Sequence, residues 1–332
     1  MATRADVAKL AGVSESTVSY VLSGKRPIGE ETRKQVLKAI DKLGYKANYA
    51  ASALAGGSPR MVTMMTENMF LTPPSQIDGA LVDGIVSGVA QSGFHSVIWP
   101  ISSGDDSDIQ ALVESNFSGG VILMRVTEND RRARYLHERG VHFFVIGRTN
   151  VEFEYNYVDR DFETVYRNAL QILTDAGHTN IGLLSGNSEI NPFMKRASAS
   201  FKVSLELINS KNNVESGSEV ARSIKQNHPK VTAILSLLDL ATLGFVETCA
   251  EVGISIPADL SIIGVNMLED QAENSKVRIS TIAFHAYEIA QSCGKMMVEI
   301  IKAGKIETTK RSELWVGEYM DRGSIAPVKA RS

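Results

Sequence analysis

From Met61 onward the chain alternates short apolar runs with amphipathic stretches of helical periodicity, and this alternation limits the possible folds most strongly. A short apolar run is typical of a parallel strand buried on both faces, and a helix usually connects it to the next strand. Two of the amphipathic stretches span 77–91 and 163–176. The runs predicted as buried strands are 61–65, 96–99, 120–124, 143–146, 181–184, 233–235 and 261–265. The pattern predicts an α/β body of two doubly wound parallel-sheet subdomains, whose strand ends are the place for a ligand.

The first 60 residues differ from this body in charge. They contain ten Lys or Arg and five Asp or Glu, so they carry +5, while the remaining residues carry −8 of the overall −3. A small basic segment beside a larger acidic body suggests that the N-terminal segment contacts a polyanion. A charged, solvated surface explains the same numbers equally simply.

The same segment is typical of three short helices. Thr3 and Asp6 can form a capping box at the start of a helix over 4–11, which Gly12 can end. We expect a second helix over 15–22, capped by Ser14, and a third over 30–43, with the apolar residues of the three facing inward. Leu10 and Leu37 belong to these predicted inward faces. Helix, glycine turn, helix is the geometry that places a second helix in the major groove, although a small bundle with a polar face fits the spacing as well.

The residues of this segment add more than their spacing. The run ADVAKLAGVSESTVS at 5–19 and the run beginning ETRKQVL at 31 and ending LGY at 45 resemble the headpiece of the lac repressor (LacI–GalR) family. The resemblance implies that Glu15, Ser16 and Tyr20 read base edges. It implies contacts with the DNA backbone for Ser14, Thr17, Ser19 and Tyr45, and Thr3 joins the set of expected DNA-binding residues. Tyr20 stands where relatives often have Arg, so the operator preference is expected to differ.

Residues 48–56, NYAASALAG, resemble the hinge helix of the same family. A helix this short is unstable alone, so we expect it to form when it is paired with a second copy on DNA. The resemblance implies DNA contacts for Asn48, Ala51 and Leu54, with Leu54 entering a base step from the minor groove and kinking the duplex. Without the headpiece, an alanine-rich linker would be the favoured interpretation. Ala47 stands where the family usually has proline.

The resemblance continues through the body, in GGVIL at 119, VIGR at 145, AGHTNIG at 176 and IPADLSIIG at 256. It implies the type I periplasmic-binding-protein fold, with three crossovers near 158–161, 282–285 and 313–316. We expect a helix-turn-helix headpiece at 1–46, a hinge helix and linker at 47–60, and an effector-binding and dimerisation domain at 61–332. The expected N-subdomain comprises about 61–159 and 285–312, and the C-subdomain about 160–284 and 313–325.

The expected effector cleft departs from the family pattern. Arg196 lies one residue too far from Ser200 and Phe201 to match the family's ligand-binding arginine, and a solvated helix charge is the alternative. Asp239 remains from an Asn-Asp pair and can instead cap its helix. Asn266 replaces the first Asp of a Gly-aromatic-Asp-Asp motif and can donate as well as accept hydrogen bonds. The remaining candidates are Asn191, Phe70 and Phe193, of which the two aromatic residues can stack on a ligand or pack in the core.

Several other classes of protein are disfavoured. The first strand of the body is not followed by a glycine-rich turn, and there is no nucleophile elbow or P-loop, so we expect no enzyme, no catalytic residue and no cofactor. The two cysteines, Cys249 and Cys293, are far apart without nearby histidines, which disfavours a metal site or a disulfide framework. His178 is assigned to a structural turn. We find no apolar run of membrane-spanning length and no secretory signal, so a cytoplasmic protein is expected rather than a periplasmic sugar-binding protein.

These observations predict a sequence-specific transcriptional regulator, a repressor, controlled by a small-molecule effector. A sugar or glycoside is expected, and a nucleoside or purine acting as inducer or corepressor is the alternative. The expected partners are a near-palindromic DNA operator, the effector and a second copy of the chain, with no membrane. Assembly is expected to stop at a dimer, because residues 321–332 contain no leucine heptads. The stripe of Ile77, Leu81, Ile85 and Val89 is either the dimer surface or the face buried against its own sheet.

Overall fold

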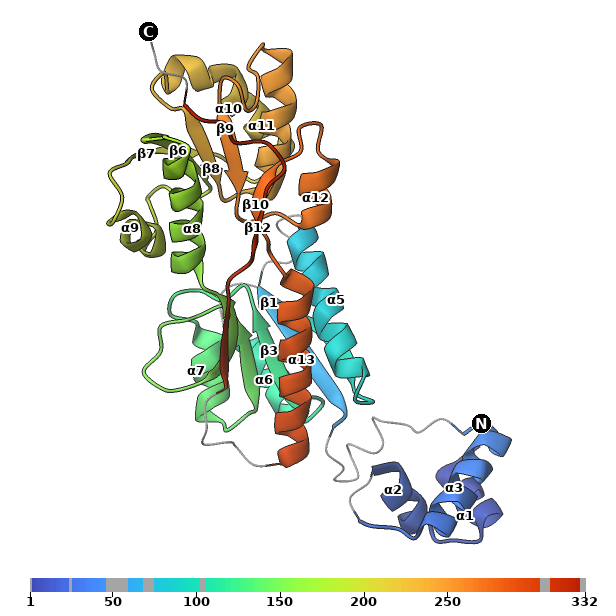
Figure 1. Cartoon of the computed structure of the whole chain (residues 1–332). Helices are drawn as coiled ribbons and strands as arrows, with labels where there is room; N and C mark the ends of the chain where they lie inside the picture. Colours follow the sequence, from blue (N-terminus) through green and yellow to red (C-terminus); the bar gives the residue numbers. More distant parts are fainter. Residues whose placement is uncertain are drawn as a thin grey trace.

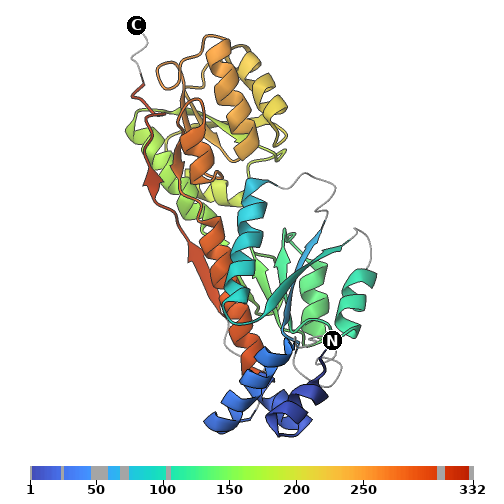
Figure 2. The ribbon, with the colours of Figure 1, turned by 90° about the vertical axis from the view of Figure 1, so that its right-hand side faces the viewer.

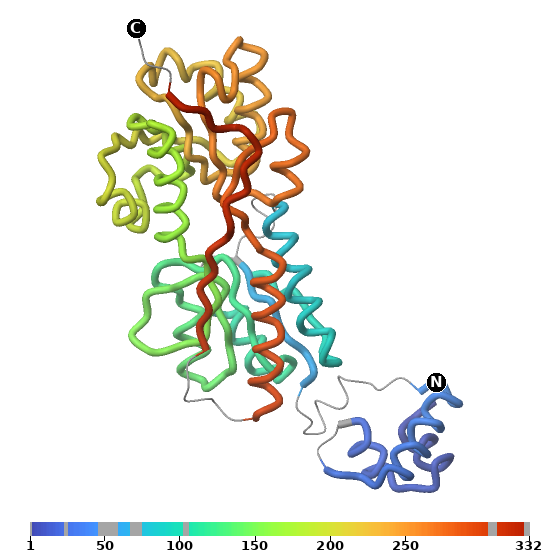
Figure 3. The backbone as a smooth tube through the Cα atoms, in the orientation of Figure 1, coloured from blue at the N-terminus to red at the C-terminus, as the bar shows by residue number. Residues whose placement is uncertain are grey.

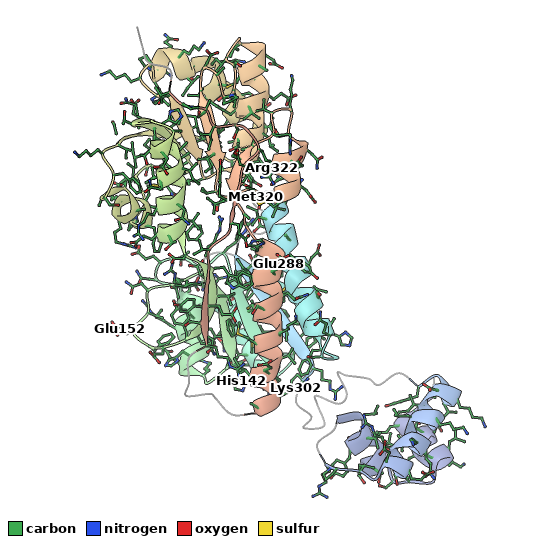
Figure 4. All side chains as sticks on the ribbon, viewed as in Figure 1. His142, Glu152, Glu288, Lys302, Met320 and Arg322 are labelled. Carbon is green, nitrogen blue, oxygen red and sulfur yellow. The ribbon has the colours of Figure 1, made fainter. Side chains whose placement is uncertain are left out.

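The computed structural model describes residues 2–23, 26–45, 59–67, 75–101, 106–304 and 311–328. A small helical headpiece lies beside one end of an elongated body, and the body consists of two stacked α/β units (Figures 1 and 4). This architecture confirms the expected fold class. Among the described residues, none of the helices combines the length and the apolar character that crossing a membrane requires.

The headpiece contains α1 (Arg4–Ala11), α2 (Glu15–Ser23) and α3 (Glu30–Leu43). The predicted capping box is present, because the Thr3 side chain accepts from the Asp6 amide and the Asp6 carboxylate accepts from the Thr3 amide. Gly12 ends α1 in the left-handed region, with φ of 65°. The buried core of the headpiece consists of Val7, Ala8, Val18, Val36 and Ala39.

Leu10 and Leu37 do not belong to this core. Their exposed fractions are 45% and 44%, so their predicted inward orientation is wrong. The small residues Ala8 and Ala39 are buried on α1 and α3 instead, and the two bulkier leucines are exposed. A core built from so few side chains leaves part of its apolar surface in solvent.

The first body subdomain is a six-stranded, fully parallel sheet with helices on both faces. Its strands follow the order β11-β5-β4-β3-β1-β2. The strands are β1 (Met61–Glu67), β2 (His95–Ile101), β3 (Gly120–Met124), β4 (Phe143–Ile146), β5 (Asn156–Arg160) and β11 (Ser312–Trp315). The helices are α5 (Gln76–Ala90), α6 (Ser107–Glu114), α7 (Arg131–Glu138) and α13 (Ala286–Ala303).

Strand β3 shows why this sheet needs both helical layers. Ile122 and Met124 point into the core beneath α5 and α13, whereas Val121 and Leu123 point into the core beneath α6 and α7. Successive side chains alternate between the two faces of a strand, so a strand covered on both faces consists entirely of apolar residues. This is the pattern by which the sequence predicted the strand.

Helices α5 and α13 lie side by side (Figures 1 and 2) and pack at backbone distance. A Cβ atom on Gly84 would lie 2.2 Å from the carbonyl oxygen of Tyr287, so only glycine permits this approach. Ile85 and Val89 are fully buried, and Leu81 packs against the same core. The stripe on 77–91 was expected to be either a dimer surface or a face buried against its own sheet. Leu81, Ile85 and Val89 fit the second interpretation.

The second body subdomain repeats the plan. Its sheet has the order β12-β10-β9-β8-β6-β7, and its pairs are parallel except that β12 runs antiparallel to β10. The strands are β6 (Asn180–Ser185), β7 (Ser204–Asn209), β8 (Ala233–Ser236), β9 (Ser261–Gly264), β10 (Ser280–Ile282) and β12 (Tyr319–Met320). The helices are α8 (Phe162–Asp175), α9 (Pro192–Ser198), α10 (Val214–Asn227), α11 (Asp239–Glu251) and α12 (Glu269–Asn274).

Three connections join the subdomains, and the tube in Figure 3 shows the C-terminal segment, which contains the last connection, running along the length of the body. The connections follow β5, β10 and β11, and hydrogen bonds link them to one another. The Asp161 amide donates to the Trp315 carbonyl over 2.9 Å, and the Ala283 amide donates to the Glu318 carbonyl over 2.8 Å. Strand β11 still pairs with β5 in the first sheet, so the last connection begins beyond Trp315, at the end of the crossover expected near 313–316.

His178 links the C-terminal segment to the second sheet. Its Nε2 lies 2.9 Å from Ser261 Oγ and 3.1 Å from the Ala326 carbonyl, and its Nδ1 lies 2.9 Å from Thr232 Oγ1. The side chain is buried, and this burial lowers the pKa of His178, which the hydrogen bond to Ala326 partly opposes. These contacts are structural, as the sequence suggested.

The lowered pKa of His178 predicts a pH dependence of stability. The unfolded chain takes up a proton near pH 6.5, whereas the folded chain resists it, so the free energy of unfolding should fall as the pH drops below about 6.5. Urea unfolding at pH 7 and pH 5 measures this loss, and His178→Gln should remove part of it. An equal pH-dependent loss in both proteins would contradict the prediction.

Candidate DNA-binding and effector sites

The second helix of the headpiece presents a polar N-terminus. Ser14 caps α2, because its Oγ accepts from the Thr17 amide over 3.1 Å, and it also lies 2.7 Å from Ser16 Oγ. Glu15 pairs with Arg4 at 3.3 Å, but both side chains are largely exposed, and such pairs contribute little stability. The carboxylate of Glu15 therefore remains available to accept hydrogen bonds from a base edge.

The other expected DNA-binding residues have different surroundings. Thr3 forms the capping box of α1, and Ser19 is half-buried on α2. Tyr20 is half-buried, with the Arg26 guanidinium 5.2 Å from its ring centroid. Tyr45 packs against the headpiece core. Asn48, Ala51 and Leu54 lie outside the described residues.

The body presents arginines at the carboxyl ends of three neighbouring strands. Arg125, Arg148 and Arg160 follow or end β3, β4 and β5, and parallel strands place these ends at one edge of the sheet. The sequence reasoning did not single out any of the three. The sequence did contain a signal for these arginines. Each one follows or ends a predominantly apolar or mixed apolar and polar strand, and the carboxyl ends of these strands form the edge of the sheet where ligands bind.

Arg125 is held by a carboxylate at the start of α5. Its guanidinium donates to both oxygens of Asp78, over 3.1 Å and 2.6 Å. Burial alone would raise the pKa of Asp78, but hydrogen bonds from Arg125 and Ser75 keep it below its ordinary value. The pair lines a small pocket together with Met64, Val82 and Ile98. A fixed donor thus stands beside a fixed acceptor.

Arg148 forms the second such pair and also reaches the second subdomain. Its Nε donates to Asp159 over 2.7 Å, and its guanidinium carbon lies 4.9 Å from the ring centroid of Phe193 on α9. Burial raises the pKa of Asp159 even though Arg148 opposes this change. The Asp159 side chain is mostly buried and the Arg148 side chain partly exposed, so the pair lies at the boundary between core and solvent.

Arg160 lies where the first connection leaves β5, and it is 2% exposed. Its Nη2 donates to the carbonyls of Ile282 and Ala283, over 2.8 Å each, and its Nη1 donates to the carbonyl of Val265. Burial lowers the pKa of Arg160 to about 10, so it remains charged at neutral pH. The side chain joins the first connection to the second one and to the end of β9.

The candidate effector residues of the second subdomain follow β6, β8 and β9, which are neighbours in its sheet. On α9, Asn191 caps the helix by accepting from the Met194 amide, and Phe193 is partly buried. Arg196 is half-exposed and donates to Glu163 over 2.6 Å. Phe70 lies outside the described residues.

Asp239 and Asn266 follow β8 and β9. Asp239 is buried, and its carboxylate accepts from the side-chain amide of Asn212 over 2.7 Å. Asn266 accepts from Arg160 over 3.2 Å and donates to the Leu237 carbonyl over 3.2 Å. Asn266 therefore lies where the two subdomains meet. Among the described residues, no group of three or more His, Cys, Asp or Glu side chains is placed to hold a metal ion.

A headpiece with a capped second helix, joined to two parallel-sheet subdomains that are linked by three connections, defines a helix-turn-helix regulator with a periplasmic-binding-protein-like body. A family profile described as "Bacterial regulatory proteins, lacI family" matches residues 3–48, and one described as "Periplasmic binding protein-like domain" matches residues 170–325. The chain belongs to the lacI family and is a DNA-binding transcriptional regulator.

Full-length relatives and solved structures agree with this assignment. The chain is 29% identical over 340 residues to an uncharacterized HTH-type transcriptional regulator of Streptomyces limosus, covering 97% of this chain and 94% of that protein. It is 25% identical over 318 residues to the HTH-type transcriptional repressor PurR of Vibrio vulnificus, covering 91% and 92%.

Two solved structures have the same fold. The lac repressor dimer bound to operator and the anti-inducer ONPF has a TM-score of 0.77 at 20% identity, covering 98% of this chain and 99% of that chain. The complex of the transcriptional regulator CelR with cellobiose has a TM-score of 0.68 at 22% identity, covering 98% and 100%.

Proposed function

We propose that the chain is a dimeric, cytoplasmic repressor whose affinity for a near-palindromic operator is controlled by a sugar or glycoside bound between the two body subdomains. One observation carries the choice of a sugar. Two arginine–carboxylate pairs, Arg125–Asp78 and Arg148–Asp159, stand at the carboxyl edge of the first sheet, and Arg148 lies 4.9 Å from the centroid of the Phe193 ring. A sugar hydroxyl both donates and accepts, so it can bond to both members of such a pair, while its apolar face suits an aromatic ring.

The names of two similar proteins support two effector classes. CelR is in complex with cellobiose, which favours a sugar, while the name of PurR keeps a purine as the second candidate. A purine can stack on the same Phe193 ring. The paired guanidinium and carboxylate groups favour the hydroxyl-rich ligand, so we place the sugar first.

In the headpiece, we propose that Glu15, Ser16 and Tyr20 contact bases, and that Thr3, Ser14, Thr17, Ser19 and Tyr45 contact phosphates. The hinge residues Asn48, Ala51 and Leu54 complete the interface in the minor groove. The division into residues 1–46, 47–60 and 61–332 follows from the same assignment.

A combined binding experiment tests this function. Selection from random DNA should return half-sites about one helical turn apart, and Glu15→Gln should change the preferred bases more than the affinity. A thermal-shift screen with cellobiose, maltose, guanine and hypoxanthine should raise the melting temperature with a sugar, because a ligand of the folded state stabilises it.

The site assignment is then tested with variants. Arg196→Ala and Asn266→Ala should each weaken the shift caused by that sugar and leave operator binding intact. A shift with purines alone would replace the proposed effector class, and asymmetric selected sites would contradict the dimeric operator complex. A normal sugar response in both variants would place the ligand elsewhere.

A further inference from the structure

Two arginines of the first subdomain reach residues of the second one. Arg160 bonds to the carbonyl of Val265 and to Asn266 close to the connections, where the two subdomains are covalently joined. Arg148 reaches the ring of Phe193 on α9 instead. In Figure 1, α9 lies above α7 on the side of the body opposite α5. The contact joins side chains of the two subdomains, so it must be lost when they move apart.

Arg148 is oriented before it meets the ring. Its Nε donates to Asp159 over 2.7 Å, and its Nη2 donates to the Arg160 carbonyl over 3.4 Å, both on β5 of its own subdomain. An arginine fixed in this way loses little further side-chain freedom when it contacts an aromatic ring. The guanidinium therefore belongs to the rigid edge of the first sheet.

Phe193 is equally well anchored on the other side. Asn191 caps the helix that carries it, and the ring packs 6.2 Å from the ring of Phe162 on α8. A second guanidinium, from Arg196, lies 4.9 Å from the same ring centroid, and Glu163 holds it in place. The ring thus has one guanidinium from each subdomain beside it.

We propose that Arg148 and Phe193 form a latch that holds the cleft closed when no effector is bound, and that the effector takes over the ring surface that Arg148 covers. The second half of this proposal rests on the proposed function. The first half concerns the protein alone. Guanidinium groups are attracted to the face of an aromatic ring, and removing such a contact should lower the ratio of closed to open molecules on the order of fivefold.

The latch is tested by measuring the distance across the cleft in the full chain without ligand. Spin labels on Glu138→Cys in α7 and Lys202→Cys after α9 report on the two subdomains, and both native residues are exposed. The native cysteines do not interfere, because burial raises the pKa of the Cys249 thiol to about 12 and that of Cys293 well above its ordinary value. Dilution with unlabelled chains limits each assembly to one labelled chain.

We expect Arg148→Gln to add a longer distance to the distribution, and Phe193→Leu to add the same one while keeping an apolar side chain. The double variant should show no more opening than either single variant, because both remove one contact. Arg134→Gln, which changes an exposed arginine on α7 of the same subdomain, is the matched control and should leave the distribution unchanged.

Three results would overturn the latch. An unchanged distribution in Arg148→Gln would show that the contact does not hold the cleft. Additive opening in the double variant would show that the two residues act separately, and opening in the Arg134→Gln control would assign the effect to surface charge. Because the measurement uses no ligand, it can fail while the sugar-binding proposal stands, and the reverse is also true.

Discussion

Replacing Arg132 by Met is expected to lower the free energy of unfolding by about 3–5 kcal/mol. Arg132 is fully buried at the start of α7, and its guanidinium donates to both oxygens of Asp130, over 2.9 Å and 2.7 Å. It also donates to the Met124 carbonyl at the end of β3 over 3.1 Å. The substitution leaves a buried carboxylate without its cation, and this unpaired charge is the main source of the loss.

Equilibrium unfolding in urea at pH 7 measures this effect. The double variant Asp130→Asn with Arg132→Met should recover part of the loss, because it removes both charges and asparagine can still cap α7. Arg131→Met, at the neighbouring exposed pair with Asp106, should change stability by less than about 1 kcal/mol. An Arg132→Met protein as stable as the Arg131→Met control would refute the prediction.

The strands that the sequence predicted and those that it missed differ in their surroundings. Strands β3, β8 and β9 are buried along their whole length, and apart from Ser236 and Ser261 they consist of apolar residues and glycine. Strand β7 lies at a sheet edge and is mostly half-exposed, while β5 ends in Asp159 and Arg160. An edge position and residues that form ion pairs or bond to the other subdomain both add polar side chains, so the apolar signal disappears where the strand meets solvent or the other subdomain.

The candidate sites also divide into contacts that the local sequence predicts and contacts that it does not predict. The N-terminus of α2 depends on contacts three residues apart, such as Ser14 with Thr17, so the local sequence predicts its cap. The cleft depends on residues far apart in the sequence. Asp239 was open to a role as a helix cap, yet its carboxylate bonds to Asn212 in the loop before α10 and lies 3.5 Å from the side-chain amide of Gln271 on α12. No local pattern specifies such partners.

Arg160 is the clearest example of this limit, because it donates chiefly to backbone carbonyls more than 100 residues away in the sequence. A carbonyl acceptor leaves no trace in the amino-acid sequence, since every residue has one. The position also explains why the side chain remains charged although burial lowers its pKa to about 10. Several oriented carbonyls replace the water that burial removes.

Replacing Arg160 by Met is therefore expected to lower the free energy of unfolding by roughly 2–4 kcal/mol, because hydrogen bonds from a charged donor are lost and buried carbonyls remain unsatisfied. It should also reduce the effect of a bound effector on operator affinity, since Arg160 joins two of the three connections and holds Asn266. Operator binding without effector should persist, because the headpiece is untouched.

Urea unfolding and operator titrations with and without the sugar found in the thermal-shift screen check both parts. Arg160→Lys keeps the charge, but one ammonium group cannot reach the carbonyls of Val265, Ile282 and Ala283 together, so an intermediate loss is expected. Arg167→Met, at an exposed pair with Glu163 on α8, is the control and should change stability by less than about 1 kcal/mol. If Arg160→Met unfolds like this control and its operator affinity still responds fully to the sugar, then Arg160 does not hold the connections together, and the hydrogen bonds between their backbones must do so alone.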